Sequence, residues 1–137
     1  MMPKRYLFDT DVLIAYLRGY HQAVELLQAL AAQGFDFLIS PITIIEIEAG
    51  IRDTEKEKTY ELLDIFEACT VDRSITHSAG SSLRKYRKKG VTLGLADVII
   101  AATALTHHLT LVTYNTSHYP MSDLQILSPS SSPKSLK

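Results

Sequence analysis

The sequence of 137 residues contains no tryptophan, a single cysteine and almost no net charge. The lone cysteine, Cys69, excludes an internal disulfide, which fits a reducing compartment. A net charge of −1 excludes a generally basic surface, so any affinity for nucleic acid must come from a local patch. We find no apolar run of about 18 residues that predicts a transmembrane helix, and no signal-peptide pattern precedes Asp9. We therefore expect a cytoplasmic protein with no membrane partner.

The remaining composition is that of an ordinary globular protein, with 46% hydrophobic and 21% charged residues. The length fits one domain, which we place at residues 1–127. The segment SPSSSPKSLK, residues 128–137, has no side chains suited to packing in a core. We predict that it forms a disordered tail.

Short apolar runs alternate along the chain with segments of helical periodicity. The runs predict strands at residues 6–8, 35–39, 70–71, 109–113 and 124–127. The helical segments lie at residues 12–19, 21–33, 42–49, 55–68, 74–89 and 93–107. This alternation predicts an α/β protein with a parallel sheet that is covered by helices on both faces.

An acidic residue follows the first apolar run. Asp9 comes directly after residues 6–8, and ligands of open α/β sheets bind beyond the carboxyl ends of the strands. The alternative is that Asp9 only caps a helix, although we expect Thr10 or Asp11 to cap the helix that starts at Val12. Asp11 lies in the first helical turn, where the helix dipole alone favours an acid, so a local role and a site role are equally plausible.

A second acid lies in the apolar segment ITIIEIEAG. Glu46 and Glu48 are two residues apart in a predicted helix, so their side chains point about 200° apart and cannot share a face. One of them is expected to be solvated and the other to face inward or toward the site. The alternative is that Glu46 is simply exposed.

Asp97 is the most anomalous acid in the sequence. It is the only charged residue between Lys89 and Asp123, and its surroundings, LGLADVIIAATAL, are typical of a buried helix. An unpaired charge there would cost several kcal/mol, so we expect a partner or a metal ion. The alternative is an acid in the first turn that the helix dipole stabilises.

Asp9, Glu46 and Asp97 come from three separate elements and are candidates for one carboxylate cluster. Sites that are rich in oxygen suit Mg²⁺ or Mn²⁺. Such an ion lowers the pKa of a bound water and neutralises a phosphodiester oxygen. Periodicity alone does not show that the three acids meet.

A basic patch occupies the end of one predicted helix. Five of the six residues from Arg84 to Lys89 are basic, and Arg84 and Lys88 are four residues apart, so they share a helix face. A role in binding RNA phosphates is one interpretation. The other is a solvated helix end, where cations complement the dipole. Only Tyr86 is aromatic in this patch, so base stacking is not indicated.

Four motifs in order resemble the PIN domain and, within that family, the VapC-type toxins. They are YLFDTDVLIAYL, SPITIIEIEAGI, GVTLGLADVIIAATAL and LTLVTYNTSHYP, and the resemblance runs from about Tyr6 to Leu127. It implies a three-layer α/β/α sandwich with a central parallel sheet of about five strands. It also implies a metal-dependent endoribonuclease that acts on structured RNA such as tRNA, a cognate antitoxin and a homodimer.

The resemblance also implies roles for individual residues. Asp9 and Asp97 match direct ligands of Mg²⁺ or Mn²⁺, and Glu46 matches a ligand or a residue that positions the attacking water. Thr10 and Thr113 match small hydroxyl residues beside the cluster, where they would contact substrate.

One position departs from the family pattern. Many relatives have an acid in or just after the T-x-N segment, where this chain has Asn115 and His118. Asn115 can still offer a carbonyl oxygen to a metal or a water. His118 is either a phosphate contact or an ordinary loop histidine. Because the acid is missing, we expect one well-bound metal, with any second ion held by substrate oxygens.

Two alternatives remain open. The missing acid permits a degenerate PIN fold that binds RNA or a protein without cutting. The motif FDTDV also resembles the opening of HAD-type phosphatases, in which Asp9 would be a nucleophile. Those enzymes need a later acidic pair, whereas here Asp97 is followed by Val98.

Overall fold

A computed structural model describes residues 4–130, which are built around a five-stranded parallel sheet. The strands are β1 (Arg5–Phe8), β2 (Asp36–Ile39), β3 (Glu67–Ala68), β4 (Thr110–Val112) and β5 (Ile126–Leu127). Their order across the sheet is β3-β2-β1-β4-β5, and every neighbouring pair is parallel. The central strand β1 pairs with β2 on one side and β4 on the other, which explains its uninterrupted apolar run.

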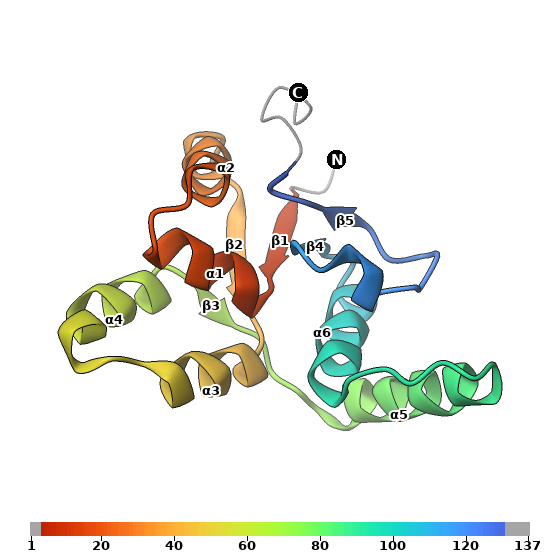
Figure 1. The fold of residues 1–137 in the computed structure, drawn as a ribbon. Coiled ribbons are helices and arrows are strands. Elements are labelled where there is room, and N and C mark those ends of the chain that lie inside the picture. The colour runs from red at the N-terminus through yellow and green to blue at the C-terminus, as the bar shows by residue number, and fades with distance from the viewer. Residues whose placement is uncertain (1–3, 131–137) are drawn as a thin grey trace.

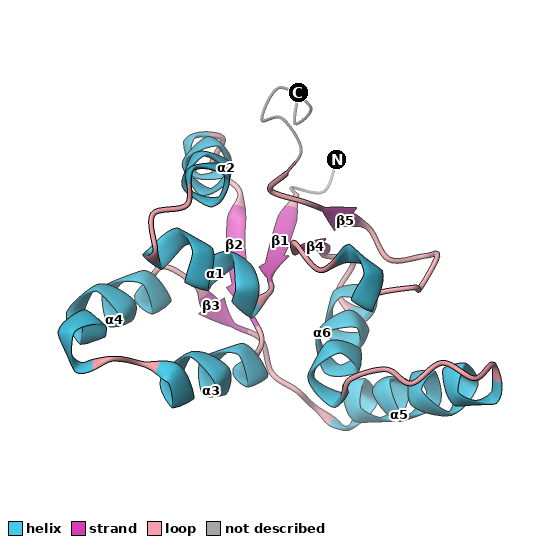
Figure 2. Cartoon of the chain, viewed as in Figure 1, coloured by secondary structure: helices cyan, strands magenta, loops and turns pink. Residues whose placement is uncertain are grey.

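Helices cover both faces of the sheet (Figures 1 and 2). They are α1 (Thr10–Leu17), α2 (His21–Ala32), α3 (Pro41–Gly50), α4 (Lys56–Asp64), α5 (Arg73–Lys88) and α6 (Leu95–Thr106), with short 3₁₀ helices η1 (Asp53–Glu55) and η2 (Thr116–His118). Tyr6 and Phe8 belong to the core beneath α1–α4, whereas Leu7 belongs to the core beneath α5 and α6. Alternate residues of β1 therefore anchor two cores, and the predicted three-layer α/β/α sandwich of about five strands is confirmed.

The predicted helix 55–68 and strand 70–71 were wrong in their boundaries. The helix α4 ends at Asp64, and β3 already begins at Glu67. Phe66 is buried and packs edge-on against Phe8, with the ring centroids 5.2 Å apart. The chain must leave the helix to place this ring over the sheet, and the backbone N–H of Cys69 then bonds to Ile39.

The last strand of the sheet lies close to the end of the described residues. The strand β5 ends at Leu127, where the predicted domain ends. The predicted tail, 128–137, lies outside the described residues from residue 131 onward. In the described part of the chain, no helix combines the length and the apolar character needed to cross a membrane.

Candidate active site

The carboxyl ends of β1 and β4 bring two polar residues together. Asp9 follows β1 and Thr113 follows β4, and the Asp9 N–H continues the strand pairing by donating to the Val112 carbonyl at 2.9 Å. The Thr113 hydroxyl then donates to Asp9 Oδ2 at 2.9 Å, and both residues are buried. The predicted placement of Asp9 at the sheet edge therefore puts it beside a second strand end.

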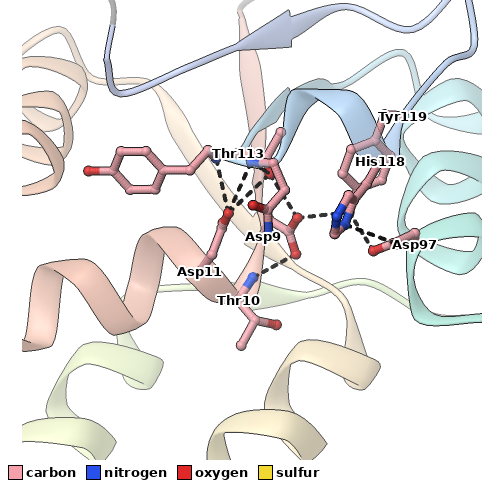
Figure 3. A network of polar contacts seen from close by, with 9 residues as sticks. Asp9, Thr10, Asp11, Asp97, Thr113, His118 and Tyr119 are labelled. Carbon is pink, nitrogen blue, oxygen red and sulfur yellow. Dashed lines mark hydrogen bonds and ion pairs between the residues drawn. The ribbon is translucent and has the colours of Figure 1, made fainter. Parts of the chain in front are cut away.

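Asp9 lies at the centre of the polar network (Figure 3). Its Oδ1 accepts a bond from the Thr10 N–H at 2.8 Å, so Asp9, rather than Thr10 or Asp11, is the N-cap of α1. Its Oδ2 accepts bonds from Thr113 and from the Tyr119 hydroxyl, the latter at 2.8 Å. Asp9 is thus both the cap of α1 and the central acid of the network. The three hydrogen bonds that it accepts compensate the cost of burying its charge.

Asp97 lies near Asp9 but belongs to α6, on the opposite face of the sheet from α1. It lies in the first turn of α6, and its side chain is 25% exposed, which is less buried than its apolar surroundings predicted. The partners expected for this charge are present. Asp97 Oδ1 lies 3.3 Å from the Tyr119 hydroxyl, and Oδ2 lies 3.4 Å from His118 Nδ1. Asp97 is therefore an acid in the first turn of a helix, as the alternative predicted, and is also part of the polar network around Asp9.

The acids around Asp97 influence one another. Burial is the largest effect on the Asp97 carboxyl and raises its pKa, while the adjoining His118 opposes the rise. The charges of Asp9 and Glu46 raise the pKa further. Carboxylates that disfavour one another's ionisation create a local demand for a cation.

Gly94 leaves room for the Asp97 carboxylate. It is the N-cap residue of α6, and a Cβ at this position would lie only 3.0 Å from Asp97 Oδ2. Any side chain here would force the carboxylate to move. The glycine therefore allows Asp97 Oδ2 to lie where it contacts His118 Nδ1.

Asp11, whose role the sequence left open, holds the segment after β4. Its Oδ2 accepts backbone N–H bonds from Tyr114 at 3.1 Å and Asn115 at 3.2 Å. Burial raises the pKa of Asp11 to about 6, and the charge of Asp9 adds to the rise. Its Oδ1 is buried without a hydrogen-bond partner among the described residues. Asp11 thus has a local bonding role and also adds negative charge beside Asp9.

Glu46 lies at the border of the cluster. It is exposed on α3, and its Oε1 accepts a bond from the Thr10 hydroxyl at 2.7 Å. This contact joins α3 to the first turn of α1, one residue after Asp9. Glu48 is also exposed, so neither glutamate faces the core, and Glu46 is the one directed toward the site.

The loop after β4 contributes Asn115, which the sequence predicted, and Tyr119, which sequence reasoning missed. The Asn115 backbone N–H also donates to the Thr113 hydroxyl at 3.0 Å, while Asn115 itself is exposed. Tyr119 is only 4% exposed, and its hydroxyl lies between Asp9 and Asp97. The one available signal was a tyrosine in a polar loop, whose hydroxyl needs a partner if it is buried.

The basic patch lies away from this network. Arg84 and Lys88 are exposed in the last part of α5, the end that points away from the sheet in Figure 1. Lys85 and Lys89 place their amino groups over the Tyr86 ring, at 5.7 Å and 5.4 Å from its centroid. The structure does not bring these cations to the acids.

The chemistry of the donors suits a hard cation. Within residues 4–130, no three Asp, Glu, His or Cys side chains form a group that could hold a metal ion together. Asp9 and Asp97 nevertheless reach one shared hydroxyl, and Gly94 leaves space at Asp97. Magnesium is commonly bound through one or two carboxylates and several waters. The oxygen donors of Asp9 and Asp97 fit an ion of this kind.

Comparison with known proteins decides the family. Residues 6–123 match the PIN domain. The chain belongs to the PIN domain family. Ribonuclease VapC10 of Mycobacterium tuberculosis is 37% identical over 84% of this chain and 86% of its own length. Ribonuclease VapC19 of the same organism is 32% identical over 87% of this chain and 96% of its own length.

A solved structure supports the same assignment. A chain of a toxin–antitoxin complex from Klebsiella pneumoniae superposes with a TM-score of 0.74 and 30% identity, covering 90% of this chain and 97% of that one. The resemblance that the four motifs carry is therefore confirmed for this PIN domain. Membership of this family favours the nuclease interpretation over the phosphatase one.

Proposed function

We propose that this PIN domain is a metal-dependent endoribonuclease and the toxin of a type II toxin–antitoxin pair. The observation that carries the proposal is the convergence of Asp9 and Asp97 on one hydroxyl at the carboxyl edge of the sheet. The similarity to chains named ribonucleases supports the reaction type. The similarity to a chain of a toxin–antitoxin complex supports the biological role.

Asp9 and Asp97 would hold Mg²⁺ or Mn²⁺. When bound, such an ion supplies a water of lowered pKa and neutralises charge on the phosphodiester. Glu46 is exposed at the border of the cluster, which suits a residue that orients the attacking water. The Thr113 hydroxyl fixes Asp9, and exposed Asn115 can present its side-chain carbonyl to a water or to RNA.

The substrate would be RNA, with structured RNA such as tRNA as the expected class. Arg84 and Lys88 are exposed and well separated from the acids, so they would contact the backbone of an RNA that extends beyond the cleavage point. We further propose that Thr10 lies beside the substrate, because its hydroxyl joins Glu46 at the edge of the network. The cleavage rate would then depend on the acids, and the affinity for RNA would depend on the basic end of α5.

The expected partners follow from the same comparisons. A cognate antitoxin would bind the chain, since the Klebsiella relative was solved in a toxin–antitoxin complex. A homodimer and a cytoplasmic location remain proposals that the sequence resemblance motivates.

One experiment tests the nuclease proposal. Purified protein, free of any partner, is incubated with tRNA and Mg²⁺. We expect cleavage that EDTA, Asp9→Asn or Asp97→Asn slows by about 100-fold or more, because each removes several kcal/mol of charge stabilisation. Asp64→Asn, which changes an exposed acid at the end of α4, is the matched control and should cut normally. Cleavage that persists in EDTA or in the Asp9 variant would contradict the proposal.

A second candidate function is a non-catalytic PIN domain that binds RNA or a protein. The observation in its favour is that no three acids within residues 4–130 form a metal-holding group. Titration with Mn²⁺ separates the two candidates. The nuclease should bind Mn²⁺ at a site that Asp97→Asn weakens, whereas the non-catalytic protein should bind none there.

A further inference from the structure

One neutral side chain links the two acids of the candidate site. Tyr119 donates to Asp9 Oδ2 at 2.8 Å, and the same hydroxyl lies 3.3 Å from Asp97 Oδ1. Asp9 caps α1 on one side of the sheet, and Asp97 belongs to the first turn of α6 on the other. Figure 3 shows the Tyr119 side chain between them. The distance between the two carboxylates is thus bridged by a single oxygen atom.

The Tyr119 hydroxyl forms a shorter hydrogen bond to Asp9 than to Asp97. A phenol has one proton, and the shorter contact assigns that proton to Asp9. Asp97 Oδ1 receives the weaker share of the same proton, in the longer hydrogen bond. A phenol is neutral near pH 7, so Tyr119 acts here as a hydrogen-bond donor.

The phenol ring is held independently of its hydroxyl. Tyr119 is 4% exposed and packs in the apolar core beneath α5 and α6, which also contains Met121 and Leu124. Its backbone N–H donates to the Thr116 carbonyl at 3.1 Å, which ties it to η2. The fold therefore fixes where the hydroxyl lies, and removing that one atom is separable from disturbing the packing.

We propose that Tyr119 is a positioning residue of the metal site, whose hydroxyl holds Asp9 Oδ2 in place and sets the spacing between Asp9 and Asp97. The inference rests on the proposed function. It assigns the phenol no contact with metal or substrate. The two oxygens that the phenol does not contact have partners of their own: Asp9 Oδ1 accepts a bond from the Thr10 N–H, and Asp97 Oδ2 lies beside His118 Nδ1.

Binding of Mn²⁺ tests this role directly. The variant Tyr119→Phe keeps the ring and removes the hydroxyl, and Mn²⁺ affinity is measured from the electron paramagnetic resonance signal of the free ion. We expect the dissociation constant to rise about tenfold, the effect typical of removing a residue that orients a metal ligand. The control is Tyr114→Phe, in the same loop, because the Tyr114 hydroxyl bonds to neither acid within residues 4–130. Its affinity should match the wild type.

A purely structural role predicts a different pattern. It would lower the unfolding temperature of Tyr119→Phe equally with and without Mn²⁺ and leave the dissociation constant unchanged, which would overturn the inference. As a second measurement, 3-fluorotyrosine is placed at Tyr119 and followed by fluorine NMR during addition of Mg²⁺. We expect its resonance to shift, and a resonance that stays in place would count against the proposal.

Failure of this inference is distinguishable from failure of the proposed function. If wild-type protein cleaves RNA and binds Mn²⁺ but Tyr119→Phe binds Mn²⁺ equally well, only the positioning role is refuted. If wild-type protein neither binds Mn²⁺ nor cleaves RNA, both proposals fall.

Discussion

Replacing each of three buried threonines by valine should change the unfolding free energy by a different amount at each position. Thr43, Thr103 and Thr113 all have 0% exposed surface, so valine, which has nearly the same shape, changes little except the hydroxyl. The three hydroxyls differ in what they bond. Thr113 bonds the Asp9 carboxylate, Thr103 bonds the Ile99 carbonyl within α6, and Thr43 has no partner among the described residues. Thr→Val therefore tests the hydroxyl at each site, and at Thr113 it also removes the acceptor of the Asn115 N–H.

The expected changes in unfolding free energy follow from these partners. Thr113→Val should destabilise the metal-free protein by about 2 kcal/mol, because it removes a bond to a charged group. That change lowers the unfolding temperature by about 8 °C for a chain of this size. Thr103→Val should stay within about 0.5 kcal/mol of the wild type, since its bond back to a helix carbonyl adds little. Thr43→Val should stabilise by about 1 kcal/mol, because it removes an unsatisfied buried hydroxyl.

Urea denaturation followed by circular dichroism measures all three variants. EDTA is present throughout, so that metal binding does not contribute to stability. We expect the order Thr43→Val, Thr103→Val, Thr113→Val from most to least stable. If Thr113→Val is as stable as Thr103→Val, the bond to Asp9 contributes nothing and the account of the Asp9 carboxylate is wrong.

Three further predictions concern the metal, the RNA and a glycine. Mn²⁺ at 100 times its dissociation constant should stabilise the wild type by about 2.7 kcal/mol in thermal unfolding, and Asp97→Asn should abolish most of this gain. Replacing Arg84 and Lys88 together by alanine should weaken RNA binding and reduce the slope of log affinity against log salt by about 0.7 for each phosphate that the variant no longer neutralises, with the cleavage rate at saturating RNA unchanged. Gly94→Ala should weaken Mn²⁺ binding measurably, because its Cβ would lie 3.0 Å from the Asp97 carboxylate. The matched Gly80→Ala has open space in α5 and should stabilise the fold by about 1 kcal/mol.

Much of the fold was predictable because burial leaves a pattern in the sequence. The apolar run of β1 and the helical spacing of α2, α5 and α6 correspond to elements of the structure. The error at the end of α4 has a physical reason. Leu62 and Phe66 are four residues apart, so Phe66 continues the apolar face of the helix. Only its contact with Phe8 on β1 shows that the chain has already turned toward the sheet, and periodicity cannot report a contact between distant segments.

The acids of the site were easier to find than the groups that hold them. Asp97 stands out because a charge in an apolar helix is unusual, whereas Thr113 and Tyr119 are ordinary residues for a strand end and a loop. Their importance depends on distances to Asp9 across more than 100 residues of sequence. Asp11 was ambiguous for the same reason, because its bonds go to backbone N–H groups that carry no sequence signal.

The loop after β4 also gives a reason to expect a single metal ion. In place of the acid that the resemblance led us to expect, this segment supplies the hydroxyls of Thr113 and Tyr119 and the backbone N–H of Asn115, and it places His118 beside Asp97. These donors stabilise Asp9 and Asp11 without adding charge, so the repulsion that a second cation would have to relieve is smaller. The departure from the family pattern therefore lowers the repulsion among the carboxylates but does not abolish it. We therefore propose a single divalent cation at Asp9 and Asp97, the two acids that share the Tyr119 hydroxyl.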